Sequence, residues 1–226
     1  MARSGLFELW ATVLAAMLAA ILLSATSFMS DAGAQEPPCT GQVVLDPGHG
    51  GTDSGAVNTK YKLTEKAQTL DVALKLKTLL ESDGYTVCMT RTTDKSLSNN
   101  DRYTYANTTG AGVLVSIHMN GSSNSSHDYT TTLFGKWRKD KELATTVFES
   151  LSALPAAGAT GTIATKQPYS FASGVLLKSE MPATIAETVF ITSDREGQLL
   201  SDGTGTRQQQ IAEALKVGVE NYLTTH

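Results

Sequence analysis

Short apolar runs alternate with longer amphipathic segments along most of this chain. Five runs have the length and β-branched content of buried strands; they cover 42–46, 86–90, 113–117, 130–134 and 183–190. Four segments have apolar residues at helical spacing; they cover 64–83, 101–108, 139–154 and 205–223. Because strands and helices alternate, the pattern predicts an α/β fold with a mostly parallel central sheet flanked by helices on both faces.

The first helical segment has a start signal and a stop signal that agree with its apolar periodicity. Thr64 is a suitable N-cap and Gly84 a suitable stop after the helix. The predicted core face consists of Ala67, Leu70, Ala73, Leu74 and Leu80. Further along, 155–173 is small and polar, which predicts a mobile loop, and 175–177 predicts a short strand.

The turn after the first strand is the first candidate for chemistry. Asp46-Pro47-Gly48-His49-Gly50-Gly51 ends the strand abruptly and places His49 just past its carboxyl end. Ligands of open α/β sheets collect at that edge. Taken alone, the segment is equally compatible with a glycine-rich turn that contains an incidental histidine.

Three other polar residues are predicted at the same edge. His118 directly follows the run 113–117, Glu65 begins the helix that leaves the first long loop, and Glu187 lies in the last strand. Two histidines and one carboxylate form a known catalytic zinc set with an open position. Glu187 is then suited to act as a general base. The three ligands are far apart in sequence and match no local zinc motif, so spacing alone leaves the metal site open.

Composition limits the class of protein. The chain has 226 residues and a formal net charge of -4, which does not favour nucleic-acid binding. Residues 1–34 have the features of a signal peptide: Arg3, an apolar run from Leu9 to Ala25, and Ala32-Gly33-Ala34 as a cleavage pattern. We therefore expect one domain at 35–226, exported to the periplasm, cell wall or medium, monomeric and without a lasting membrane anchor. The alternative is an uncleaved anchor, because the run is at the short limit for spanning a bilayer.

The chain has two cysteines, Cys39 before the first strand and Cys88 in the second. An even number in an exported protein favours a disulfide. The two side chains can meet if those strands are neighbours. Two buried free thiols remain the alternative.

Several blocks of the sequence together resemble a known family, the zinc-dependent N-acetylmuramoyl-L-alanine amidases of the Amidase_3 type. The blocks are 43–51 with Asp53, 63–66, 90–94 with Arg102 and 115–120, and 181–191. They come in the family's order, and the resemblance covers nearly all of 42–223. Two departures are Val189, where the family usually has glycine, and Met119, which replaces a common small residue and is expected to narrow the cleft.

The resemblance implies one Zn²⁺ held by His49, Glu65 and His118, with Glu187 as the catalytic carboxylate. The implied substrate is peptidoglycan or a muropeptide, cut at the amide between the lactyl group of N-acetylmuramic acid and L-alanine. Asn120 and Asp53 are candidates for orienting the substrate or the ligands, or for simply forming turns. Two other functions remain open: a zinc peptidase or carboxypeptidase that cuts the stem peptide elsewhere, and a non-catalytic wall-binding protein.

Overall fold

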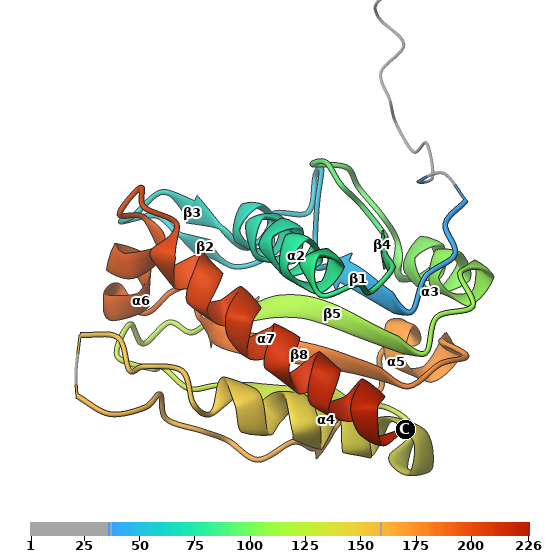
Figure 1. The fold of residues 1–226 in the computed structure, drawn as a ribbon. Coiled ribbons are helices and arrows are strands. Elements are labelled where there is room, and N and C mark those ends of the chain that lie inside the picture. Colours follow the sequence, from blue (N-terminus) through green and yellow to red (C-terminus); the bar gives the residue numbers. More distant parts are fainter. Residues whose placement is uncertain (1–35, 37, 159) are drawn as a thin grey trace, which may run out of the picture. The chain divides into compact units, whose positions relative to one another are not determined.

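The computed structural model describes residues 36, 38–158 and 160–226, so the predicted signal segment 1–34 lies outside the described residues. A six-stranded sheet in the order β4-β1-β5-β8-β6-β7 forms the centre (Figure 1). Its strands are β1 (Val43–Pro47), β4 (Val87–Met89), β5 (Val113–Asn120), β6 (Thr131–Phe134), β7 (Tyr169–Ser170) and β8 (Ala183–Phe190). The first four in sheet order are parallel, and β6 is antiparallel to β8. This confirms the mostly parallel sheet.

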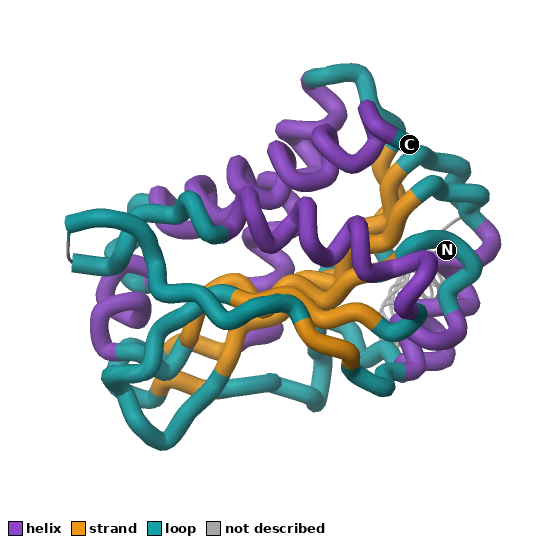
Figure 2. The backbone as a smooth tube through the Cα atoms, turned by 90° about the horizontal axis from the view of Figure 1, so that it is seen from below, coloured by secondary structure: helices purple, strands orange, loops and turns teal. Residues whose placement is uncertain are grey.

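Helices pack against both faces of the sheet, as predicted. One face carries α2 (Glu65–Ser82), α4 (Trp137–Leu151) and α7 (Thr206–Thr225), and Figure 1 shows α7 crossing in front of the strands between α2 and α4. The other face carries α3 (Asn99–Thr108) and α5 (Gly174–Lys178). Figure 2 shows the long helices stacked along one side of the strands.

Side chains of β1 alternate between these two cores. Val43 and Leu45 are packed in the cluster that includes α2 and α7, whereas Val44 belongs to the cluster that includes α3 and α5. Successive side chains of a strand point to opposite faces. Because both faces are covered, the strand is apolar at every one of these positions.

Helix α2 has the predicted ends but not the predicted core face. It follows Thr64 and stops before Gly84, whose φ is 91°. Ala67 is exposed and Leu74 is 39% exposed, so both were wrongly placed in the core. The buried stripe is Glu65, Thr69, Val72, Ala73, Leu76 and Leu80. The stripe begins with two polar residues, Glu65 and Thr69. A prediction from hydrophobicity alone therefore assigned the wrong face of the helix to the core.

Several further elements differ from the prediction, and strand β7 lies within the segment 155–173 that was predicted as a loop. Residues 175–177 lie in helix α5 rather than in a strand, because three apolar residues do not distinguish the two structures. The first long loop contains a small antiparallel hairpin of β2 (Val57–Asn58) and β3 (Leu63–Thr64). Helix α6 (Asp194–Leu200) was not expected at all. No helix among the described residues is long and apolar enough to cross a membrane.

Cys39 and Cys88 form a disulfide, with their Cα atoms 5.9 Å apart. The strands β1 and β4 are neighbours, with Val44 opposite Cys88, which was the condition for this pairing. The alternative of two free thiols is therefore excluded. The bond ties the segment before β1 to the edge strand β4.

Candidate metal centre

The carboxyl ends of three parallel strands bring the predicted residues to one edge of the sheet. His49 follows β1, His118 lies near the end of β5, and Glu187 lies in β8 directly opposite His118. Glu65 is the first residue of α2 and is 3% exposed. Residues that are far apart in sequence thus meet because the strands are parallel and in register.

Glu65 stands between the two histidines. Its Oε1 lies 3.0 Å from His49 Nε2 and 3.0 Å from His118 Nδ1. One ligand atom from each of the three residues lies within 4.8 Å of the others. Two imidazole nitrogens and one carboxylate oxygen suit a first-row divalent metal, and three protein ligands leave a further position open. The donor set therefore fits a metal ion.

The carboxylate of Glu65 is fixed by the backbone as well. Ala56 N donates to Oε2 at 2.8 Å and Met119 N donates to Oε1 at 3.0 Å. Burial by itself would raise the pKa of Glu65, but the hydrogen bonds and charges of His118 and His49 hold that pKa far below its usual value. Glu65 is therefore ionised across the physiological pH range.

Asp53 contacts the imidazole of His49 on the side away from Glu65. Its Oδ2 lies 2.8 Å from His49 Nδ1, and its Oδ1 accepts from Gly55 N at 3.1 Å. Burial opposes protonation of His49, yet its contacts with Glu65 and Asp53 raise its pKa. A proton held at Nδ1 by a carboxylate leaves Nε2 facing Glu65, which is the usual arrangement around metal-binding histidines.

Two glycines are required by how closely the ligands pack on the backbone. A Cβ at Gly48 would lie 2.4 Å from Cε1 of the His118 ring. A Cβ at Gly55, whose φ is 63°, would lie 2.5 Å from Glu65 Oε2. These positions exclude side chains because imidazole and carboxylate already occupy the space.

Glu187 lines a cleft of about 310 Å³ together with His49, His118, Tyr169 and Phe171. Burial raises the pKa of Glu187, the charges of the two histidines oppose this, and the charge of Glu65 adds to it. A carboxyl group whose pKa is moved toward neutrality is suited to take up and return a proton.

Asn120, Met119 and Val189 are the other residues of this region that the sequence singled out. Asn120 ends β5; its carbonyl accepts from Ile191 N, and its side-chain nitrogen is buried with no hydrogen-bond partner among the described residues. Met119 is 2% exposed and Val189 is fully buried, both in the core on the α2 side of the sheet. The expectation that Met119 narrows the cleft was wrong, because neighbouring residues of a strand point to opposite faces.

A buried polar cluster lies beside the candidate metal ligands. Arg102 forms an ion pair, with Nη1 2.7 Å from Asp46 Oδ1, and Asp46 also accepts from Thr90 and Ser116. Arg91 is fully buried and contacts the turn that carries His49, which the sequence did not indicate. The available signal was an arginine placed directly after a buried strand.

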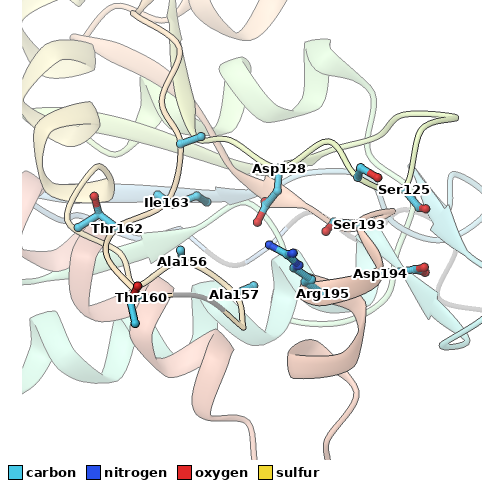
Figure 3. A pocket seen from close by; sticks show the side chains of 12 residues that line it. Ser125, Asp128, Ala156, Ala157, Thr160, Thr162, Ile163, Ser193, Asp194 and Arg195 are labelled. Atoms are coloured by element: carbon cyan, nitrogen blue, oxygen red, sulfur yellow. The ribbon is translucent and has the colours of Figure 1, made fainter.

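A second cavity, of about 460 Å³, lies beside the start of α6 and contains none of the predicted ligands. Figure 3 shows Asp128 and Arg195 directed toward each other across it. Next to Asp128 lies the fully buried Glu196, whose side chain is paired with Arg207. Among the described residues, the group of side chains that could hold a metal ion lies at the first cleft.

Comparison with known proteins gives a family for this arrangement. A family model described as N-acetylmuramoyl-L-alanine amidase matches residues 43–221. The probable cell wall amidase LytH of Staphylococcus epidermidis is 34% identical over 186 residues, which cover 81% of this chain and 58% of that protein. LytH of Staphylococcus aureus is 32% identical over 195 residues, covering 84% and 62%. The chain thus spans less than two thirds of the length of these relatives.

Solved structures agree with the sequence match. An N-acetylmuramoyl-L-alanine amidase from Clostridium difficile 630 superposes with a TM-score of 0.73 at 31% identity, covering 84% of this chain and 99% of that one. The catalytic domain of CwlV from Bacillus (Paenibacillus) polymyxa gives a TM-score of 0.71 at 29% identity, covering 81% and 98%. Because the family model matches most of the chain and the converging His-Glu-His set lies within the match, this chain belongs to the N-acetylmuramoyl-L-alanine amidase family.

Proposed function

We propose that this domain hydrolyses the amide bond between the lactyl group of N-acetylmuramic acid and L-alanine, in peptidoglycan or its fragments. The observation that carries the proposal is the convergence of His49, Glu65 and His118 on one point, with Glu187 opposite His118 in the neighbouring strand. We propose a single Zn²⁺ as the metal, held by those three residues. Nitrogen and oxygen ligands with an open position favour this ion.

The residues divide the chemistry between them. Zn²⁺ in such a site supplies Lewis-acid polarisation of a carbonyl and a lower pKa for water. Glu187 accepts the proton of the attacking water and returns it to the nitrogen of the leaving L-alanine. Asp53 holds the tautomer of His49, and the backbone N–H groups of Ala56 and Met119 hold Glu65 in place.

The cleft supplies surfaces for the substrate. Tyr169 is 38% exposed and Phe171 48% exposed, and both line the cleft that contains Glu187. Leu133 and Ile185 lie opposite each other in β6 and β8 and also line it. We propose that these apolar side chains contact the substrate near the scissile amide. Asp53 and Asn120 stay candidates for orienting it.

We propose that the protein works outside the cytoplasm, as a monomer, with 1–34 as a cleaved signal peptide ahead of the catalytic domain at 35–226. The disulfide between Cys39 and Cys88 supports an oxidising compartment such as the periplasm or the cell wall. The similarity to the LytH proteins, which are described as probable cell wall amidases, supports the same location.

The test is hydrolysis of muramyl dipeptide and of a longer soluble muropeptide, with products identified by mass. We expect a free lactyl carboxylate and a free L-alanine amine, and no product after removal of the metal by a chelator. Adding Zn²⁺ back should restore turnover. Full activity in a preparation of verified low metal content would refute the metal-dependent mechanism.

Glu187→Gln sharpens the same experiment. Loss of the proton acceptor should lower kcat by about 10²–10⁴-fold, with Zn²⁺ still bound at the wild-type stoichiometry. Glu149→Gln, on an exposed position of α4, is the matched control and should keep wild-type kcat. If cleavage occurs between other residues of the stem, the protein is a peptidase; if the muropeptide is bound but not cut, it is a wall-binding protein.

A further inference from the structure

The three residues of the turn that ends at His49 direct their backbone carbonyls toward two arginine side chains. Pro47 O accepts from Arg91 Nε at 3.0 Å and from Arg102 Nη1 at 2.8 Å. Gly48 O accepts from Arg91 Nη2 at 2.8 Å, and His49 O accepts from Arg102 Nη2 at 2.8 Å. Each carbonyl of the turn 47–49 therefore has a guanidinium donor.

This arrangement accompanies an unusual backbone. His49 has a φ of 60°, in the left-handed region that side chains other than glycine adopt rarely. A chain that turns this way directs its carbonyls out of the sheet ladder, and buried carbonyls require donors. The two arginines provide them. The same backbone conformation sets the direction of the His49 imidazole toward Glu65.

Both arginines are themselves fixed. Arg91 is fully buried and also donates to the carbonyls of Lys66 and Thr93, whereas Arg102 is 5% exposed and is paired with Asp46. Burial and the charge of Arg102 lower the pKa of Arg91 to about 10, so that it stays charged at neutral pH. Two positive charges next to a site for a cation disfavour that cation by simple repulsion. Attraction for the metal is therefore not their role.

We propose that Arg91 and Arg102 are positioning residues for the metal: together they hold the turn 47–49 so that His49 faces Glu65 and His118. We call this pair the carbonyl clamp. The proposal rests on the proposed metal-dependent function and adds two residues that lie outside the set of proposed metal ligands. Their planar forks donate to two carbonyls at once, which the single ammonium of lysine does not reproduce in the same geometry.

The test compares Arg102→Lys and Arg91→Lys with wild type by Zn²⁺ titration against a chromophoric chelator, and by thermal unfolding of the metal-free proteins. Both variants keep the positive charge and lose the planar guanidinium that donates to two carbonyls at once. We expect each to bind Zn²⁺ about 10–100-fold more weakly, as is typical when a partner of a metal ligand is changed. Arg207→Lys is the matched control, since Arg207 is 2% exposed and contacts Glu196 and Pro155 rather than the turn. It should lose stability but keep the wild-type Kd for Zn²⁺.

The outcomes separate the clamp from simple structural support. If both clamp variants unfold earlier but bind Zn²⁺ within threefold of wild type, the proposal is overturned. Tighter binding would show that the arginine forks do not favour the geometry that binds the metal, and would also overturn it. If wild type itself binds no Zn²⁺, the proposed function fails; if wild type binds and the variants bind equally, only the clamp fails.

Thr69→Val gives a test that does not depend on folding of the arginine variants. Thr69 Oγ1 donates to Gly48 O at 2.9 Å and lies 3.2 Å from Arg91 Nη2. Valine has a similar shape and lacks the hydroxyl. One lost hydrogen bond to the turn should weaken Zn²⁺ binding about three- to tenfold. An unchanged Kd in this variant would count against the clamp.

Discussion

Two buried arginine–carboxylate pairs lie in this domain and serve different regions. Arg102 pairs with the fully buried Asp46, and its remaining donors contact the carbonyls of the turn that carries His49. Arg207 pairs with the fully buried Glu196, and its remaining donors contact Pro155 O and Gln210. The first pair adjoins the candidate metal ligands, whereas the second lies next to Asp128, which lines the cavity of Figure 3.

The two carboxylates also differ in their pKa. Burial would raise the pKa of Asp46, but the charge of Arg102 and hydrogen bonds from Thr90 and Ser116 hold it below its usual value. Burial raises the pKa of Glu196 to about 7; Arg207 opposes this, and the nearby Asp128 adds to it. The pKa of a carboxylate in a buried ion pair thus depends on its other neighbours as well as on its arginine partner. One is an ionised anchor for a functional turn, and the other is a pH-sensitive structural contact.

The largest effect is expected on Zn²⁺ affinity, which should depend on the region around His49 and not on the region around Glu196. His118→Ala should weaken Zn²⁺ binding by about three orders of magnitude, because one of three ligands is removed from a site of the order of 10–16 kcal/mol. Chelator competition measures this. Glu196→Gln should leave the Kd for Zn²⁺ unchanged. Wild-type affinity in His118→Ala would contradict the assignment of the ligands.

The second prediction concerns the stability contributed by the Glu196–Arg207 pair rather than metal binding. Glu196→Ala leaves Arg207 buried without its partner, which should cost about 3–5 kcal/mol of unfolding free energy. Urea unfolding of the metal-free protein measures it. Glu149→Ala, on the exposed side of α4, should cost far less. A loss of Zn²⁺ affinity in folded Glu196→Ala would show that the two regions are coupled.

The smallest effect is a pH dependence. The folded-state pKa of Glu196 is about 7 and that of an unfolded glutamate is near 4.5, so the folded protein binds the extra proton between these values. The stability contributed by this proton is present below about pH 4.5 and is lost as the pH rises through about 7. Asp128 and Arg207 face this group: Arg207 opposes the rise in the pKa of Glu196, and Asp128 adds to it.

The measurement is the unfolding free energy of metal-free wild type and Glu196→Gln at intervals from pH 5 to 8. The difference between wild type and variant should fall as the pH rises. A difference that stays constant, or that grows with pH, would contradict the raised pKa of Glu196. The low pKa of Asp46 contributes no slope in this range, because Asp46 is ionised throughout.

Much of the fold followed from local patterns. The strand Ala183–Phe190 has the predicted bounds, and α2 has the predicted ends. Histidines and a glutamate placed after apolar runs predicted the edge of the sheet at which they meet, because carboxyl ends of parallel strands lie together. Short segments failed: 175–177 is helical, and α6 was missed, because neither is long enough to show a period.

The contacts that hold the site could not be predicted in the same way. Leu45 pairs with Met89 in the β1–β4 register, which places Arg91 beside Pro47 and allows it to contact the turn. A shift of one residue would have turned Arg91 to the other face of the sheet. Neither composition nor spacing specifies that register. The sequence marks Arg91 only as a polar residue after a strand.

The amino-acid sequence by itself determined the fold class and the edge at which His49, Glu65 and His118 converge. These follow from hydrophobic periodicity and strand polarity, which are local properties. The sequence left the pairing of Cys39 with Cys88 conditional on their strands being neighbours, which the structure decided. Only the tertiary structure decided which atoms face one another and which carbonyls the buried arginines contact. Those features depend on register, burial and side-chain packing, which arise when distant segments come together.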